Sequence, residues 1–271
     1  LKPVSVMTVW RITLKGLQGV RGLLKCILAE FMKVKRKKFV LGTLLAAWIL
    51  PVPLTIIVVK AKLSFDILFM FAIEFGFFLI LPIVLGIIAS SSINVEYDNQ
   101  TFKNMLSISI SKGMMLWAKI IFLIFMSFLY GIGAMVSVTI GGVVLGDYAS
   151  VMSKLGMAVL LSFMVALSIL PVYIVTVLAA KKHIIPTVFT IAYTIVCFIS
   201  SLKLVRLPLP LTTVFRWALP HISNNSRLIN TAGNGKISEW IVTLPYCIGT
   251  IVLMSVVSIG LTTVILNNRE V

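Results

Sequence analysis

Six long apolar stretches, separated by shorter polar ones, set the pattern of this 271-residue chain. A helix needs about 20 mostly apolar residues to cross the hydrocarbon core of a bilayer, and the pattern therefore predicts six transmembrane helices. Their expected bounds are Phe39 to Val59, Ile67 to Ser90, Leu116 to Gly142, Met157 to Ala180, His183 to Leu202 and Trp240 to Leu266. The fifth is the least clearly separated, because only Lys181 and Lys182 stand between it and the fourth.

The stretch before the first predicted span mixes apolar and basic residues at helical spacing. Between Leu14 and Lys38, apolar side chains recur every three or four residues and so share one face of a helix. They are Leu17, Val20, Leu24, Ile27, Leu28, Phe31 and Val34. We expect an amphipathic helix that lies in the membrane interface and transmits motion from a cytoplasmic partner. The alternative is a basic segment that only orients the chain.

Composition agrees with a membrane location. The chain is 59% hydrophobic and 12% charged, with a mean hydropathy of +1.10, whereas soluble domains carry about twice that share of charge. The net charge of +16 would suggest nucleic acid in a soluble protein. Here the basic residues precede or separate the apolar stretches, as is typical of contact with anionic lipid, so nucleic acid is not an expected partner. The predicted class is an all-α integral membrane protein with six transmembrane helices and an N-terminal interfacial amphipathic helix.

The basic N-terminal segment decides the predicted orientation. Residues 1–38 carry ten Lys or Arg, and segments rich in these residues stay on the cytoplasmic side. Six spans then put both termini in the cytoplasm of a bacterial cell. The later loops do not decide the orientation, because those on the inner side hold 6 basic residues and those on the outer side hold 8.

Two connections are long enough to have structure of their own. Residues 91–115 join the second and third spans and would be cytoplasmic, whereas residues 203–239 join the fifth and sixth and would be outside. In the outer connection, Leu211 to Leu219 is apolar enough to form a re-entrant or surface-lying helix. The chain thus divides into a basic segment, 1–38, and a six-span domain, 39–271.

The inner connection has features of a docking element. Its first part is polar, with Glu96 and Thr101, and a short apolar face of Phe102, Met105 and Leu106 follows at helical spacing. A two-turn helix with both acidic and apolar contacts could be held in a pocket on another protein. The alternative is an ordinary connecting loop.

Several catalytic motifs are missing from the sequence. It contains no GxxxxGK[ST] phosphate-binding loop and no HExxH motif. His183 and His221 are isolated, so a zinc site or a His-based triad is not expected. The cysteines have neither metal-ligand nor redox spacing and are interpreted as packing residues; they are Cys26, Cys197 and Cys247. We therefore expect no metal and no cofactor in this chain.

Glu74 is the acidic residue that lies well inside a predicted span. A charge at mid-membrane costs about 2.5 to 3.5 kcal/mol on insertion scales, so the side chain should face the helix bundle or a wet cavity. Two interpretations stay open. Glu74 is either structural, being protonated or paired with a hydroxyl, or it lines the translocation path of a cationic peptide.

Small residues and prolines mark places where spans should pack closely or bend. Gly133, Ser137 and Gly141 form a stripe along the third span, which would let another helix approach closely, within the subunit or across a subunit seam. Prolines inside spans predict kinks or freed backbone groups near a cavity. They are Pro51, Pro53, Pro82, Pro171 and Pro245.

Together these features resemble the permease subunits of ABC-2 type transporters. The likeness is carried by the acidic residue after the second span, a short helix ending near Met105-Leu106-Ser107, a Ser-Lys-Gly step and Lys119 inside the third span. Residues 29–36, AEFMKVKR, are similar to the segment with which those permeases enter their first span. The resemblance covers most of residues 23–271. Within the family it is greatest to the lantibiotic-immunity permeases, which export antimicrobial peptides from the membrane.

The resemblance implies a coupling helix between the second and third spans, which would place Glu96, Thr101, Phe102, Met105 and Leu106 against an ATPase. It also implies a separate cytoplasmic ATPase subunit that binds the ATP, a second permease chain, different or identical, and a peptide substrate. Residues 1–22 exceed the family pattern, and the opening Leu1 suggests an alternative start codon or a fragment. Two other classes stay open: a membrane sensor or scaffold that never transports, and a membrane-embedded lipid-modifying enzyme.

Overall fold

The computed structural model describes residues 22–33, 38–98, 112–179, 182, 184–222 and 239–268. All regular structure in these ranges is helical, and six segments are long and apolar enough to cross a membrane. They are Val40–Lys60, Phe65–Asn94, Lys112–Val144, Ser150–Leu178, Ile184–Leu202 and Leu244–Asn268. The predicted all-α class and the six spans are confirmed, and the weakly separated fifth span is among them.

Two spans are interrupted at a proline, as the sequence predicts. The first span consists of α2 (Lys38–Ile49) and α3 (Pro51–Lys60), and the fourth consists of α8 (Tyr148–Ser168) and α9 (Pro171–Leu178). In both, the second helix begins at the proline, which has no N–H for the preceding turn and clashes with its carbonyl. Each span nevertheless continues across the break.

The second span changes its helix type along its length. It begins as α4 (Phe65–Phe71), continues as the nine-residue π-helix η1 (Ala72–Ile80) and ends as α5 (Leu81–Asp98). Most π-helical segments are single turns, and they are frequent at functional sites. The end of α5 lies about two turns beyond the predicted end of the span at Ser90.

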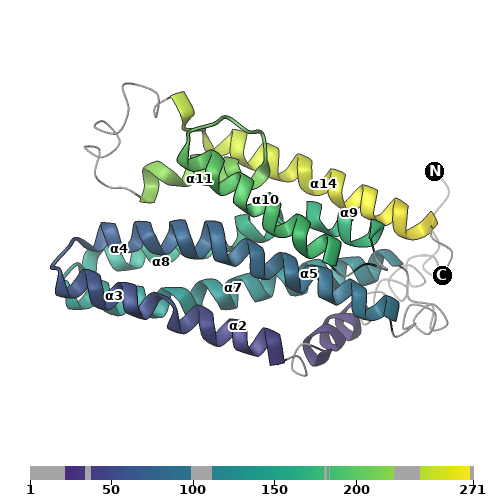
Figure 1. Cartoon of the computed structure of the whole chain (residues 1–271), viewed down its shortest axis with the longest axis horizontal. Coiled ribbons are helices and arrows are strands. Elements are labelled where there is room, and N and C mark those ends of the chain that lie inside the picture. The colour runs from purple at the N-terminus through teal and green to yellow at the C-terminus, as the bar shows by residue number, and fades with distance from the viewer. Residues whose placement is uncertain are drawn as a thin grey trace, which may run out of the picture.

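The longest helix, α7 (Lys112–Val144), is the centre of one layer of the bundle. It packs against α2, α3, α5 and α8, and its buried face includes Phe122, Leu123 and Val138. The first span lies at the edge of this layer (Figure 1), and little of it is buried. Much of its apolar surface is therefore open to lipid or to another chain.

A second layer is formed by α10 (Ile184–Leu202), α11 (Pro210–Ile222) and α14 (Leu244–Asn268) (Figure 1). The helix predicted at Leu211 to Leu219 is present as α11. Its residues from Pro210 to Ala218 are all buried, and it contacts α8, α10 and α14. This packing is that of an inserted helix and not of one lying on the surface.

One expected kink is absent. Pro245 lies in the first turn of α14, where a helix tolerates proline because the N–H it lacks would have no intrahelical partner. The prediction of a bend at this proline was wrong, because the sixth span begins at Leu244 and not at Trp240.

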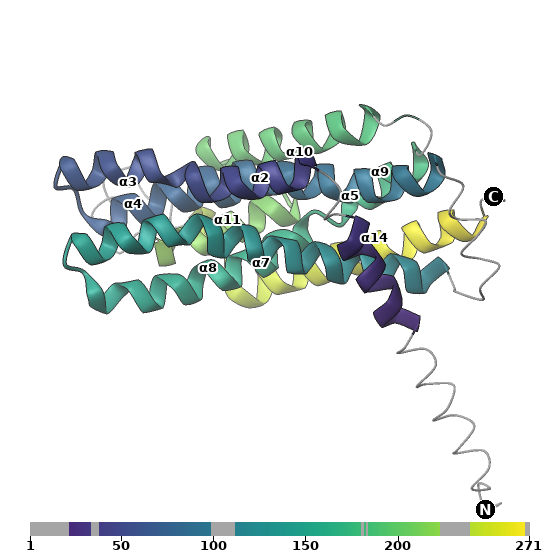
Figure 2. The same ribbon diagram turned by 90° about the horizontal axis from the view of Figure 1, so that it is seen from below.

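Residues 22–33 form a helix that runs across the long axis of the bundle (Figure 2). Its apolar side chains Leu24 and Leu28 are more than half exposed, whereas Cys26 and Glu30 on another side are buried. The start of α7 lies beside it, and α5 and α14 end at the same end of the bundle (Figure 1). We call this the N-terminal end of the bundle, and the opposite end, where α3 ends and α8 begins, the far end.

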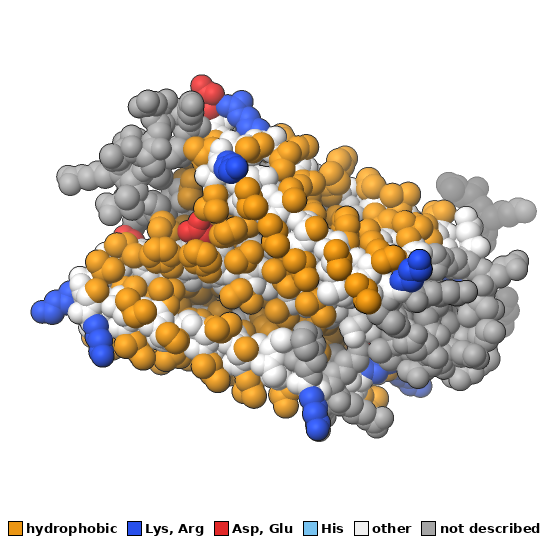
Figure 3. Space-filling view, in the orientation of Figure 1, with side chains coloured by type: hydrophobic (Ala, Val, Ile, Leu, Met, Phe, Trp, Pro, Cys, Tyr) orange, Lys and Arg blue, Asp and Glu red, His pale blue; other side chains and the backbone are white. Residues whose placement is uncertain are grey.

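The outer surface fits an apolar environment. Figure 3 shows hydrophobic side chains over most of one face, with Lys and Arg side chains at its margins. Large apolar side chains are exposed on several spans, including Ile49, Ile57 and Leu253. A soluble protein seldom leaves so continuous an apolar surface uncovered.

Candidate functional site

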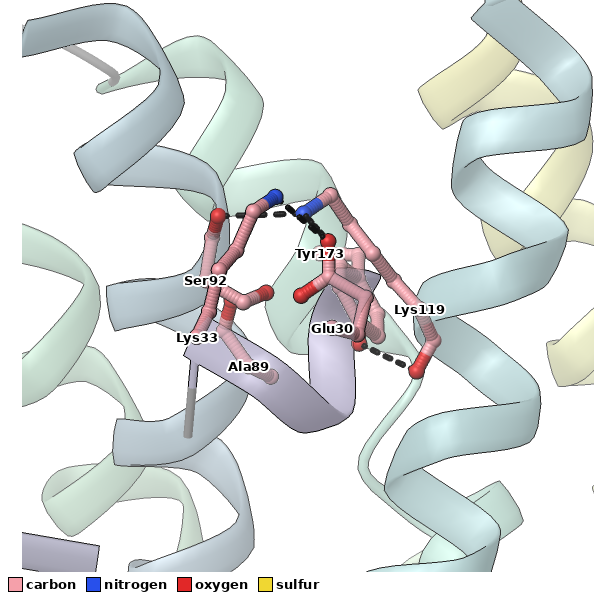
Figure 4. A network of polar contacts seen from close by, with 6 residues as sticks. All are labelled: Glu30, Lys33, Ala89, Ser92, Lys119 and Tyr173. Carbon is pink, nitrogen blue, oxygen red and sulfur yellow. Dashed lines mark hydrogen bonds and ion pairs between the residues drawn. The ribbon is translucent and has the colours of Figure 1, made fainter. Parts of the chain in front are cut away.

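A buried polar site lies at the N-terminal end and is centred on Lys119 of α7. The Lys119 side chain is 3% exposed and its Nζ lies 2.9 Å from Glu30 Oε1. The same ammonium group donates to the carbonyl of Ser92 at 3.0 Å. Figure 4 shows the three residues converging from the N-terminal helix, α5 and α7. A buried charge is stable only when it is paired and hydrogen-bonded, and Lys119 meets both conditions.

Glu30 is held by two lysines. Lys33, one turn further along the same helix, donates to Glu30 Oε1 at 2.9 Å, the same distance as Lys119. Burial alone would raise the pKa of Glu30, but the ammonium groups of Lys119 and Lys33 outweigh it, so the net pKa is below the ordinary value of 4.5. The carboxylate is therefore charged at neutral pH and fastens the N-terminal helix to α7.

Aromatic packing strengthens the same junction. The ring of Phe31 meets Phe122 and Phe125 of α7 edge to face, with centroid distances of 5.2 and 4.8 Å, a favoured geometry for aromatic pairs. On the other side, the Tyr173 hydroxyl of α9 donates to the Lys119 carbonyl at 3.4 Å. We call Glu30, Lys33, Ser92, Lys119 and Tyr173 the junction network.

The inner connection begins and ends beside this network. Glu96 lies in the last turn of α5, and Lys112 opens α7 and donates to the carbonyl of Leu266 in α14 at 2.9 Å. The four other expected coupling residues lie outside the described residues; they are Thr101, Phe102, Met105 and Leu106. Both helices that carry the connection are thus tied to other elements at the N-terminal end.

The junction network was not foreseen, although Glu30 and Lys119 each stood out in the sequence. Glu30 lay in the segment similar to family permeases, and Lys119 was a lysine inside an apolar span. The signal that could have paired them is their opposite charge at a similar depth. They are 89 positions apart in the sequence, so no helical spacing indicates that they meet.

Glu74 lies in the first turn of η1 and is partly buried. Within the described part of the chain it makes neither a hydrogen bond nor an ion pair. A hydroxyl partner for Glu74 is therefore not found among those residues.

An apolar cavity of about 300 Å³ opens between the first and second spans and α7. Its polar groups are few, and the hydroxyls of Thr43 and Tyr130 satisfy each other at 2.6 Å. Leu54 and Phe75 contribute to its walls. The cavity suits an acyl chain or an apolar side chain.

The stripe of small residues on α7 faces the first span of the same chain. Gly133 lies against the indole of Trp48, and the Ser137 hydroxyl is 2.8 Å from that of Thr55. Side chains of Thr55 and Leu68 approach Gly141. The close approach is thus made within the subunit along this face.

Comparison with known protein families shows to which family the chain belongs. The family model for the ABC-2 family transporter protein matches residues 26–197, which include the junction network and four of the spans. The chain belongs to the ABC-2 transporter family. No curated protein and no solved structure matches it.

An ABC-2 permease is the transmembrane component of its transporter and not the ATPase, and family membership implies association with a separate ABC ATPase. The chain is therefore the membrane permease of an ABC transporter. In this permease, the junction network lies beside the inner connection. It is therefore the candidate route by which motion of the ATPase reaches the transmembrane helices.

Proposed function

We propose that this permease belongs to an ATP-driven exporter that removes lantibiotics or other antimicrobial peptides from a bacterial cell membrane. The observation that supports the export mechanism is how the inner connection joins the bundle. The helices on either side of it, α5 and α7, run into the bundle beside the buried Glu30–Lys119 pair. The family match supports the ATP-driven part. The peptide substrate is supported by the sequence resemblance and by Glu74.

In this mechanism the N-terminal end faces the cytoplasm. The ATPase partner holds the inner connection through Glu96, Thr101, Phe102, Met105 and Leu106, and its closure on ATP displaces that segment. Because Lys119 contacts both Glu30 and Ser92, the N-terminal helix, α5 and α7 would move together. A second permease chain, different or identical, forms the other half of the pathway.

A peptide substrate needs both apolar and polar contacts in the membrane. The cavity beside Tyr130 offers apolar walls, and Glu74 offers a carboxylate without a partner in the described residues. A cationic side chain in the path would neutralise that carboxylate and offset the cost of its burial. Glu74 is therefore assigned to the translocation path.

Co-purification tests the ATPase partnership. The tagged permease, extracted from its own membrane, is expected to bring down an ABC ATPase, and Phe102→Asp or Leu106→Asp should abolish its recovery. Met152→Asp is the matched control, because it makes the same kind of change at a 77% exposed side chain at the far end. An intact complex in both coupling variants would refute the assigned contact.

Loss of the permease tests the substrate. A strain without this chain should become more sensitive to cationic antimicrobial peptides, and the wild-type gene should restore resistance. A deletion strain with unchanged sensitivity to a panel of such peptides would leave the sensor or scaffold as the better account. The lipid-modifying alternative gains support only if the deletion changes lipid composition.

A further inference from the structure

A second cavity lies at the far end, apart from the apolar one, between the start of the second span, α8 and α11. Its volume of about 440 Å³ falls within the usual range for small-ligand sites, roughly 300 to 1,000 Å³. Its walls include Asp66, Ser153, Lys154, Trp217 and His221. Unlike the apolar cavity, it contains charged groups beside its hydroxyl and aromatic ones.

The positive charge in this cavity is already neutralised. Lys154 Nζ lies 2.6 Å from Asp66 Oδ1 and 3.9 Å from the centre of the Phe65 ring. The Lys154 side chain is 9% exposed, whereas that of Asp66 is 28% exposed. An anion would have to displace Lys154 from both partners, so the cavity is poorly suited to a phosphate or carboxylate ligand.

Two groups in the cavity keep unused hydrogen-bonding capacity. Asp66 Oδ2 makes no hydrogen bond within the described part of the chain, although each carboxylate oxygen accepts two. Trp217 is 7% exposed, and its indole N–H likewise has no acceptor among those residues. A ligand that satisfies both carries a cationic donor and a carbonyl acceptor. A peptide with a Lys or Arg side chain has both.

Glu74 extends the acidic surface deeper along the same helix face. The Phe78 ring packs on Phe215 of α11 with a centroid distance of 4.7 Å, so this side of the second span faces α11. Glu74 lies four residues before Phe78 in the π-helix η1, slightly less than one turn, so the two side chains lie near the same face. Glu74 lies eight positions after Asp66, at most about 12 Å along the helix axis at the α-helical rise of 1.5 Å per residue. Figure 3 shows acidic side chains in the furrow between α11 and α4.

We propose that the far-end cavity and the furrow leading to Glu74 form a binding site for peptide segments that carry two cationic side chains. Asp66 receives the first cation, Trp217 binds a backbone carbonyl and Glu74 receives the second cation. An extended chain covers about 3.3 Å per residue, so cations about four residues apart match the two carboxylates. This site rests on the proposed function, since it gives the exported peptide its point of contact.

Binding to the full chain in lipid nanodiscs tests the site directly. The probe is a dye-labelled ten-residue peptide with two lysines four residues apart, and its matched partner has glutamine at both places. Glu74→Gln and the paired change Asp66→Asn with Lys154→Met should each weaken binding of the lysine peptide about tenfold, or about 1.4 kcal/mol. Neither should affect the glutamine peptide. The paired change avoids leaving Lys154 buried without its carboxylate.

Glu239→Gln is the control, because it removes the same charge at a side chain that is 73% exposed and pairs with Arg206 instead. Binding of the lysine peptide should be unchanged in this variant. Equal affinity of both peptides for the wild-type chain would overturn the site, and so would unaltered binding in folded Glu74→Gln. If phosphatidylglycerol displaced the labelled peptide but unlabelled lysine peptide did not, the cavity would instead be a site for lipid head groups.

The binding assay needs no ATPase, so the two proposals fail separately. If the exporter works but the acidic variants bind peptide like the wild type, the site is wrong and the proposed function stands. If the lysine peptide binds as described but no ATPase associates with the chain, the site stands and the exporter does not.

Discussion

At the scale of residues, a buried pair of opposite charges, Glu30 and Lys119, links the N-terminal helix to the bundle. Both side chains are under a tenth exposed, and their atoms are 2.9 Å apart. Charge type and approximate depth could be read from the sequence. The pairing could not be read from the sequence, because it depends on how the N-terminal helix crosses α7. No local sequence pattern specifies that crossing.

Removing one member of this pair should cost more than removing both. Lys119→Met leaves the buried Glu30 carboxylate with Lys33 as its remaining ionic partner, so it should lower the free energy of unfolding by up to about 3 kcal/mol, and Lys119→Met with Glu30→Gln should cost clearly less. Chemical denaturation in mild detergent gives these values. Arg206→Met is the control, since its exposed pair with Glu239 should contribute about 1 kcal/mol or less. Strictly additive losses would contradict a direct interaction.

The same pair predicts how pH acts on the N-terminal helix. Because the pKa of Glu30 is lowered from 4.5, its stabilising contribution is complete above that value and is lost as pH falls through the lower pKa. Cys26, which is buried on this helix, should stay protected from a thiol reagent active in acid at pH 4.5 and react only below it. Glu30→Gln should remove the pH step. Exposure of Cys26 already near pH 6 would contradict the assignment.

Glu74 gives a prediction at the same scale. Glu74→Gln keeps the shape of the side chain but removes the charge that a cationic substrate would meet, so it should reduce peptide resistance several-fold without lowering the amount of permease in the membrane. Resistance is measured as the inhibitory peptide concentration, and membrane abundance by immunoblot. Equal resistance in the two strains would leave Glu74 with a structural role only.

At the scale of elements, apolar length predicted which segments form helices but not where each helix changes or ends. Hydrophobicity falls after Ser90, whereas backbone hydrogen bonding continues α5 to Asp98, because a helix does not end where the membrane does. The π-helix η1 has no signature in the apolar pattern. The breaks before Pro51 and Pro171 were predictable, since proline acts on the backbone itself.

Packing of α7 on the first two spans gives a prediction at this scale. A Cβ at Gly141 would lie 2.7 Å from side-chain atoms of both Leu68 and Thr55, so Gly141→Val should force the helices apart and cost about 1–3 kcal/mol. The melting temperature in detergent measures the loss. Gly42→Val is the control, because a Cβ there meets nothing within 4 Å. Equal melting temperatures for the two variants would show that the packing is loose.

At the scale of the whole molecule, six spans and the family were accessible from the sequence because both rest on long, continuous features. The far-end cavity was not, since its walls come from three segments of the chain that are far apart in sequence. Orientation rests on the charge of residues 1–38. That segment holds ten Lys or Arg. Its described helix, residues 22–33, lies at one end of the bundle, and α14 ends at the same end (Figure 1).

Orientation is tested by labelling from outside the cell. In a chain whose buried native cysteines are retained, Met152→Cys at the far end should react with a membrane-impermeant maleimide in intact cells. Lys182→Cys, exposed near the N-terminal end, should react only after the membrane is opened. The reverse pattern would invert the topology and place the inner connection outside, away from any cytoplasmic ATPase.

The central claim is that this permease converts ATP hydrolysis by its partner into peptide export through the inner connection. The most direct measurement is uptake of a labelled cationic peptide by inside-out proteoliposomes that hold the complete complex. The account predicts ATP-dependent uptake that stops in Phe102→Asp with Leu106→Asp, whereas uptake persists in Met152→Asp. Peptide uptake that is independent of ATP, or undiminished in the coupling variant, would contradict it.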